Sequence, residues 1–154
     1  MSEISTIQKT SLLKKLYLTF WTTSLIIFFI GIPYRNQPDE NIDINFVDTY
    51  YVIAFFQLTT FFALFYFLIG FGYWLVNRLK GRLNKILLFV HAIIMLGSFI
   101  GILIIWNVID EYDILRNTAF LISLTLILFI AQPIYVINLM LGLFNWRKDR
   151  KAKF

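Results

Sequence analysis

Apolar residues fill most of the chain in four long runs, which short polar connections separate. A helix needs about 20 apolar residues to cross the hydrocarbon core of a bilayer. Four runs meet this requirement, at residues 16–33, 49–76, 86–106 and 119–144. We therefore predict an all-α membrane protein, a bundle of four transmembrane helices that forms a single domain over residues 1–154.

The connections differ sharply in charge, and this difference predicts the orientation. Twelve of the fourteen basic residues lie before the first run, between the second and third, or after the fourth. Seven of the nine acidic residues lie in the other two connections. By the positive-inside rule, both termini are cytoplasmic and the two acidic connections face outward. In the first acidic connection, Ile42, Ile44 and Phe46 alternate with polar residues, which predicts an extended segment.

The composition of the chain excludes several classes of protein function. The chain is 59% hydrophobic and 15% charged, with a mean hydropathy of +0.73 and no cysteine. These values exclude a soluble enzyme and a nucleic-acid-binding domain. None of the four runs contains Asp, Glu, Lys or Arg, which argues against a pump, a voltage sensor or a charge-relay transporter. No catalytic constellation is evident, so we expect neither enzymatic activity nor a metal site.

Small and polar residues within the runs are candidates for helix packing. Gly97 and Gly101 lie four residues apart, a spacing that allows close approach of another helix of the bundle or of another chain. Gly70 and Gly72 have the same interpretation. Gln132-Pro133 interrupts the fourth run and predicts a kink, with the Gln132 side chain satisfying the carbonyl that proline leaves without a donor.

The single histidine, His91, lies about 9 Å into the third run at 1.5 Å per residue. A lone histidine in a membrane usually forms a hydrogen bond to a neighbouring helix. Haem ligation or proton transfer is the alternative role. Gln57 and Asn138 are two further polar residues at depth, and they could line the cavity of a small transporter or channel.

The second run opens with Val47-Asp48-Thr49-Tyr50-Tyr51-Val52-Ile53-Ala54. This sequence resembles the start of the tenth helix in subunit I of haem-copper (cytochrome c or quinol) oxidases. Tyr73-Trp74, Gly81-Arg82 and Lys85 follow in the same order as in that family, so the resemblance covers roughly residues 47 to 105. It implies that the four runs correspond to the last four helices of subunit I.

The residues that carry the chemistry of the family are missing. The family has His-Phe-His directly after the alanine, and its two histidines bind haem iron. Here Phe55, Phe56 and Gln57 occupy these positions, and neither phenylalanine nor a carboxamide replaces imidazole as an axial ligand. The copper-binding histidines of the family lie on helices that this chain lacks. The resemblance therefore implies shared ancestry without oxidase activity.

From these observations we expect a non-catalytic accessory, assembly or stabilising subunit of a bacterial inner-membrane complex of the respiratory chain. Its partners would be membrane lipids and another membrane protein or a second copy of the chain. We expect no haem or other resident cofactor, although lipid or quinone could lie between the helices. The alternatives are a haem- or quinone-binding protein that uses His91 and a small transporter or channel subunit.

Overall fold

The computed structural model describes residues 2–37, 41–46, 49–108 and 114–151, with side chains for 15–37, 49, 52–104 and 122–146. The described chain is mostly helical. Four helical segments are long and apolar enough to cross a membrane: Lys15–Asn36, Phe55–Arg78, Lys85–Ile104 and Ile122–Trp146. The prediction of a mostly helical chain with four helices long and apolar enough to cross a membrane is confirmed. A two-stranded sheet departs from the all-α expectation, and the packing of the four helices into one bundle stays a prediction. The predicted orientation of the termini stays a prediction.

Backbone contacts divide the chain into two compact units, Met1–Arg78 and Leu79–Phe154. We refer to them as unit 1 and unit 2 and describe each by itself. The single domain expected from the sequence stays a prediction.

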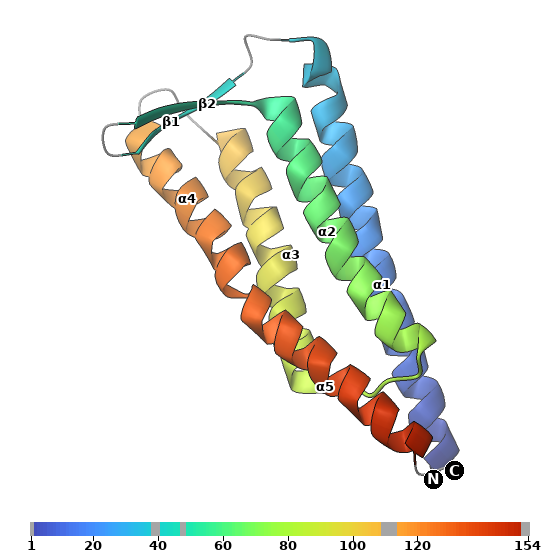
Figure 1. The fold of residues 1–154 in the computed structure, drawn as a ribbon. Coiled ribbons are helices and arrows are strands. Elements are labelled where there is room, and N and C mark those ends of the chain that lie inside the picture. Colours follow the sequence, from blue (N-terminus) through green and yellow to red (C-terminus); the bar gives the residue numbers. More distant parts are fainter. Residues whose placement is uncertain (1, 38–40, 47–48, 109–113, 152–154) are drawn as a thin grey trace. The chain divides into compact units, whose positions relative to one another are not determined.

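Unit 1 is a pair of helices joined by a segment that contains a two-stranded sheet. The order is α1 (Ser2–Gly31), the 3₁₀ helix η1 (Ile32–Asn36), β1 (Asn41–Phe46), β2 (Thr49–Ala54) and α2 (Phe55–Arg78). Helices α1 and α2 lie side by side along their length (Figure 1). At 1.5 Å per residue, the 30 residues of α1 span about 45 Å, which exceeds the hydrocarbon core of a bilayer.

The two helices of unit 1 meet through regularly spaced residues. Buried positions on α1 include Phe20, Ser24, Ile27 and Gly31, and those on α2 include Thr59, Ala63, Tyr66, Gly70 and Tyr73. Spacings of four and three place each set on one face of its helix. The Phe20 ring lies against the rings of Tyr66 and Tyr73, with centroids 6.1 and 5.7 Å apart. The Ser24 hydroxyl donates to the Ala63 carbonyl across the pair at 2.6 Å.

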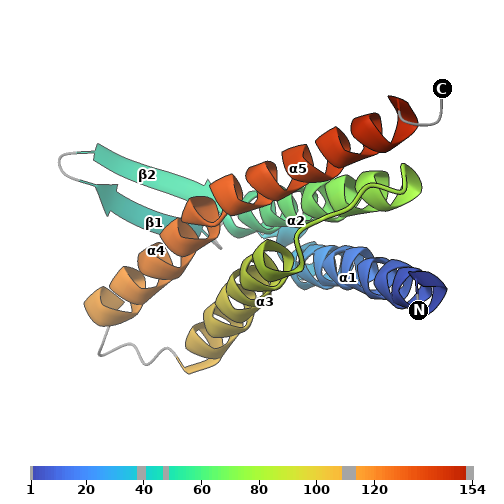
Figure 2. The same cartoon turned by 90° about the horizontal axis from the view of Figure 1, so that it is seen from below.

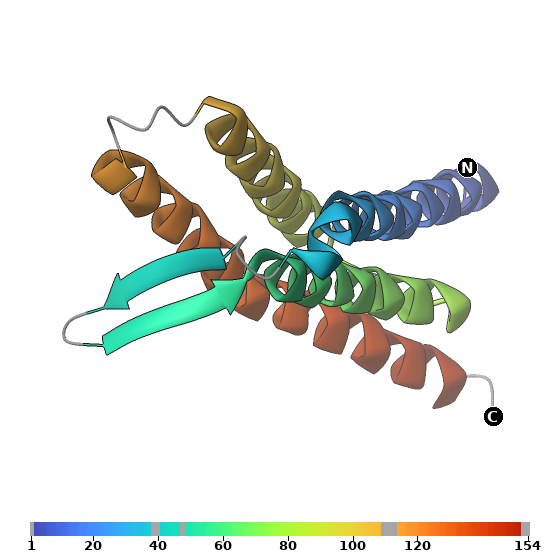
Figure 3. The ribbon, with the colours of Figure 1, turned by 90° about the horizontal axis from the view of Figure 1, so that it is seen from above.

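Strands β1 and β2 pair antiparallel from Asn41↔Ala54 to Phe46↔Thr49. The extended segment predicted around Ile42, Ile44 and Phe46 is confirmed. Strand β2 continues directly into α2, as the view from above shows (Figure 3). The second helical span therefore starts at Phe55, and its predicted start at Thr49 is wrong. The physical reason is that Thr49–Ala54 is rich in aromatic and β-branched residues, which favour a strand, and it finds a pairing partner in β1.

Unit 2 contains α3 (Lys85–Val108), α4 (Ile114–Ile130) and α5 (Gln132–Lys151). Helices α4 and α5 follow one another almost end to end with a bend, and α3 lies beside both (Figures 1 and 2). The break at Ala131 lies immediately before Gln132-Pro133, so the predicted interruption is confirmed. Helix α5 continues past the membrane-spanning segment, which ends at Trp146, to Lys151.

Candidate functional site

The residues singled out from the sequence fall in both units. Phe55 and Gln57 lie on α2 in unit 1, whereas His91, Gly97 and Gly101 lie on α3 in unit 2. Several polar residues of unit 2, together with Met95, lie where α5 meets α3 and the residue that precedes it. We call this set the polar seam: Asn84, His91, Met95, Gln132, Tyr135 and Asn138.

The spacing of residues on α3 explains why the seam forms. Asn84 precedes the helix, and the buried residues that follow are Leu88, His91, Ala92, Met95 and Ser98. Most of these positions are separated by four or three residues, which places them on one helical face. The side that faces α3 is formed by α5 and the break before it. Its buried residues are Ala131, Asn138 and Gly142, and Tyr135 between them is half-buried. Small residues on both sides leave room for the polar side chains.

Asn138 lies at the end of the polar seam next to the start of α3. Its side chain is 0% exposed and binds the backbone amide and the backbone carbonyl of Asn84. The Asn138 Oδ1 accepts from the Asn84 amide at 2.8 Å, and Nδ2 donates to the Asn84 carbonyl at 3.1 Å. Asn84 in turn caps α3, because its Oδ1 accepts from the backbone amides of Ile86 and Leu87 at 2.9 and 3.4 Å. Asn138 thus fixes the start of α3 against α5.

His91 belongs to the part of the polar seam further along α3, and its side chain is 0% exposed. Its ring stacks on that of Tyr135, with centroids 5.2 Å apart and an interplanar angle of 24°. A side-chain hydrogen bond joins it to Gln132. The Gln132 amide also lies 3.3 Å from the Met95 sulfur. These contacts agree with a histidine that joins neighbouring helices, the first of the two roles considered for it.

Gln132 also acts on the backbone at the break. Its Nε2 donates to the Leu128 carbonyl, four residues earlier. Pro133 lacks an amide hydrogen, which leaves the carbonyl of Phe129 without its usual helical donor. The side chain of Gln132 was expected to satisfy this carbonyl, but it bonds to that of the preceding residue. Gln132 therefore satisfies a backbone carbonyl beside the break, as predicted, but the acceptor is Leu128 and not Phe129.

The two glycines of the predicted packing motif differ. A Cβ at Gly101 would lie 3.1 Å from Leu124 Cδ1, so α3 and α4 approach closely there. A Cβ at Gly97 would meet nothing within 4 Å, and Gly97 is exposed. Gly101 is therefore a packing residue within unit 2, whereas Gly97 makes no such contact within the described residues.

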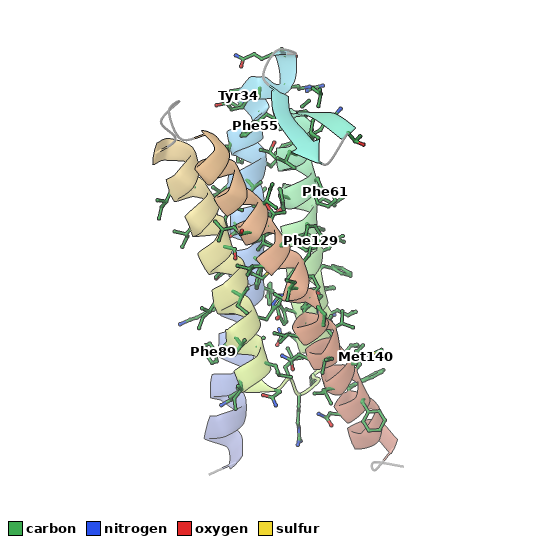
Figure 4. All side chains as sticks on the ribbon, turned by 90° about the vertical axis from the view of Figure 1, so that its left-hand side faces the viewer. Tyr34, Phe55, Phe61, Phe89, Phe129 and Met140 are labelled. Atoms are coloured by element: carbon green, nitrogen blue, oxygen red, sulfur yellow. The ribbon has the colours of Figure 1, made fainter. Side chains whose placement is uncertain are left out.

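In unit 1, Phe55 and Gln57, the two positions compared above with haem ligands of the oxidases, have different surroundings. Phe55 is buried, and its ring meets the Tyr34 ring edge-on with centroids 4.5 Å apart (Figure 4). Gln57 lies on another side of α2 and is exposed. Tyr34 comes from η1, so the side chain at the first ligand position packs inside unit 1. Asn138 binds Asn84 within unit 2.

Sequence reasoning missed several residues that carry these contacts. Asn84 was overlooked, although an asparagine just before an apolar run is a typical helix N-cap. Gly31 was overlooked because it lies near the end of its run. A Cβ at Gly31 would collide with the Thr59 side chain, and a Cβ at Gly70 would lie 2.6 Å from Trp21 Cδ1.

The donor set of the polar seam consists of amides, one imidazole, one thioether and one phenol. Among the described residues, no three or more His, Cys, Asp or Glu side chains come together as a metal site would require. Comparisons with known protein families, curated proteins and solved structures find no match for the chain.

Proposed function

We propose that this protein is a non-catalytic accessory, assembly or stabilising subunit of a bacterial inner-membrane complex of the respiratory chain. Both termini would be cytoplasmic. The observation that carries the proposal is the distribution of burial along the four spans. Only 22–39% of each membrane-spanning window is buried, so most span residues are available to lipids or to other membrane proteins.

The polar interior of unit 2 supports a structural role. Asn138, His91 and Gln132 contact partners on neighbouring helical segments. In hydrocarbon, such contacts hold helices together because a polar group without a partner is costly. A subunit that presents apolar faces to a partner needs helices fixed in this way.

The exposed faces carry large side chains. Phe61 and Leu64 on α2 are 51% and 57% exposed, and the Phe61 ring stacks on Phe65 with centroids 6.3 Å apart. Phe89 on α3 and Met140 on α5 project outward from their helices in unit 2 (Figure 4). Aromatic and aliphatic faces of this kind suit packing against a membrane protein, lipid tails or a quinone.

The respiratory assignment depends on the resemblance to oxidase subunit I. Part of its specific run, Thr49–Ala54, forms strand β2 here, whereas the corresponding run begins a helix in that family. The loss of both histidines at Phe55 and Gln57 fits a subunit without oxidase activity. The relationship to the oxidase family is therefore part of the proposal. The structural role is argued separately, from the contacts and the exposed faces of the helices.

Affinity purification tests the partner. The chain should be expressed with a C-terminal tag and purified from bacterial membranes in a mild detergent, and oxidase subunits should co-purify. Changing Phe61 and Leu64 together to alanine should reduce that yield without changing thermal stability, because both side chains are exposed. The matched control changes Ile93 and Ile100, also exposed, on α3. Isolation of the chain without any oxidase subunit would contradict the respiratory assignment.

A haem spectrum separates the main alternative. If the protein is an accessory subunit, the pyridine haemochrome spectrum of chain purified from haem-replete cells should show no stoichiometric haem. Haem that is lost on changing His91 to alanine would instead establish the haem-binding function. The variant Tyr135→Phe is a useful control, because it keeps the ring beside His91.

The orientation can be measured on the same protein. The natural chain has no cysteine, so a single introduced cysteine reports its own position without background. A cysteine replacing Asp43 should react with an impermeant maleimide added to intact cells, whereas one replacing Arg82 should react only after the membrane is opened. External labelling at position 82 would contradict the proposed orientation.

A further inference from the structure

The two strands of unit 1 pair in a register that separates apolar from polar residues. Directly opposed residues lie on the same face of a sheet, and successive pairs alternate between the two faces. Three pairs therefore share what we call the apolar face: Ile42↔Ile53, Ile44↔Tyr51 and Phe46↔Thr49. The other three pairs share what we call the polar face: Asn41↔Ala54, Asp43↔Val52 and Asn45↔Tyr50.

The polar residues of β1 are confined to the polar face. Asn41, Asp43 and Asn45 all lie there, and Asp43 is the only charged residue of the two strands. Toward the helix, Val52 on the polar face is 56% exposed, whereas Ile53 on the apolar face is half-buried. One face of the sheet thus suits water and the other suits an apolar environment.

A sheet of two strands requires a cover for its apolar face. An isolated two-stranded hairpin is at most marginally stable in water, and packing against another apolar surface is what stabilises it. Within the described part of unit 1, the main backbone neighbour of β1 is β2, and the helices α1 and α2 pack mainly on each other. The cover for the apolar face therefore comes from outside this helix pair.

The place of the sheet in unit 1 indicates the cover. Strand β2 ends at Ala54, and the next residue, Phe55, is the first of a membrane-spanning segment. The strands run across the direction of α2 instead of extending it (Figure 1). A strand of six residues is about 20 Å long, so a sheet in this position stays near the membrane surface over that length. Tyr50 and Tyr51 are residues typical of this depth.

We propose that the sheet is a membrane-surface anchor whose apolar face rests on the lipid bilayer, continuous with the exposed apolar surface of α2. The unpaired backbone groups at the two edges of the sheet need water, which the headgroup region supplies and the hydrocarbon core does not. The sheet therefore lies at the boundary of the hydrocarbon, with its polar face toward water. In the orientation proposed above, this is the outer leaflet. The anchor fixes the depth at which α2 begins, and it does not depend on the respiratory assignment.

The test measures contact with lipid at single positions of the full chain in phosphatidylcholine vesicles. The natural chain has no cysteine, so one introduced cysteine carries one fluorophore. A quencher attached to the lipid near its headgroup should quench labels at positions 42 and 44 several-fold more than labels at 43 and 45. Iodide in the water should give the opposite alternation. A quencher at the end of the acyl chain should be less effective at position 44 than the one near the headgroup, because the sheet does not enter the hydrocarbon.

A matched pair of variants tests whether the apolar residues of β1 hold the sheet on the membrane. With the label at position 53, Ile42→Ser/Ile44→Ser should reduce quenching by the lipid several-fold. The control Asn41→Ser/Asn45→Ser changes the other face of the same strand and should retain most of the quenching.

A label at position 61 on α2 reports whether the helices remain in the membrane in both variants. If the isoleucine variant does not fold, the alternation between positions 42–45 in the otherwise natural chain still decides. Equal quenching by the lipid at these four positions would overturn the proposal. Protection of positions 42 and 44 from both the lipid quencher and iodide would also overturn it, because protein would then cover the apolar face.

Discussion

The helix pair α1–α2 and the pair α3–α5 are both antiparallel contacts within a membrane-spanning region, but different groups hold them together. Between α1 and α2, small residues face bulky ones: Gly31 lies against Thr59, and Gly70 against Trp21 and Phe20. Where α5 meets the start of α3, amide side chains of α5 form hydrogen bonds with the backbone of the connection that precedes α3, at Asn138 with Asn84 and at Asn145 with Arg82.

The difference has a physical basis. In lipid there is little hydrophobic driving force between helices, so association depends on close packing and on interhelical hydrogen bonds. Unit 1 depends mainly on close packing, with Ser24–Ala63 as a hydrogen bond across the pair. Unit 2 depends more on directional bonds at defined atoms. Added volume should therefore damage unit 1 most, and loss of a donor or acceptor should damage unit 2 most.

The largest effect is expected for Asn138→Ala. The change removes two hydrogen bonds to Asn84 and leaves a cavity at a residue that is 0% exposed. Interhelical hydrogen bonds contribute about 0.6–1.7 kcal/mol each, and the backbone amide and carbonyl of Asn84 both lose their partner. We expect a loss of about 2–3 kcal/mol in the free energy of unfolding, measured by steric trapping in bicelles.

Asn145→Ala is the control for that variant. Asn145 forms a single, longer bond at 3.3 Å, and its side chain is only half-buried. Its removal should cost less than 1 kcal/mol, the usual range for one exposed bond. Equal costs for Asn138→Ala and Asn145→Ala would show that the buried amide does not dominate the contact between α3 and α5.

The second effect tests close packing in unit 1. Gly31→Ala places a Cβ into the Thr59 side chain, whose own Cβ would be 2.9 Å away. A β-branched side chain in a helix has little freedom to move aside. Overpacking of this kind costs about 1–3 kcal/mol, which a thermal melt in detergent would detect.

A double variant separates the Gly31 clash from general disturbance. Adding Thr59→Ala to Gly31→Ala removes the hydroxyl and the methyl group but keeps the Cβ at position 59, which lies 2.9 Å from the new Cβ, and should recover part of the lost stability. The coupling is read from the double-mutant cycle. Additive costs without recovery would show that α1 and α2 do not approach closely at this position.

The four spans could be predicted because a long apolar run is a strong signal, and the break at Gln132-Pro133 because proline acts locally. The strand at Thr49–Ala54 could not be separated from the run, since its residues are as apolar as those of α2 and the pairing with β1 is not local. Hydropathy therefore made the second span six residues too long at its start.

The polar seam was only partly predictable. His91 and Asn138 stand out as polar residues within apolar runs, but their partners depend on the register between α3 and α5. The partner of Asn138 is a backbone, which no side-chain pattern reveals. Gly97 and Gly101 share one motif, yet only Gly101 faces α4, because the rotation of α3 about its axis is set by tertiary packing.

This contrast gives the third prediction, a pair of identical changes on one helix. Gly101→Leu should destabilise unit 2 by about 1–2 kcal/mol, since even a Cβ would lie 3.1 Å from Leu124. Gly97→Leu should be neutral or slightly stabilising, because the position is open and leucine favours a helix. Thermal unfolding in detergent compares them directly. A larger loss for Gly97→Leu would place a partner, such as a second chain, on that face.

The smallest effect is expected at Lys80, where a side chain occupies a left-handed backbone conformation with φ 57°. Glycine adopts this conformation without the steric cost, which is about 1–2 kcal/mol for other residues. Glycine also gives the unfolded chain more freedom, which offsets part of the gain. Lys80→Gly should therefore raise the free energy of unfolding by no more than about 1 kcal/mol in neutral detergent. Lys80→Gln provides the comparison, because it removes the charge but retains the strained backbone. If both variants lose intrinsic stability equally, the left-handed conformation at residue 80 is not what limits this connection.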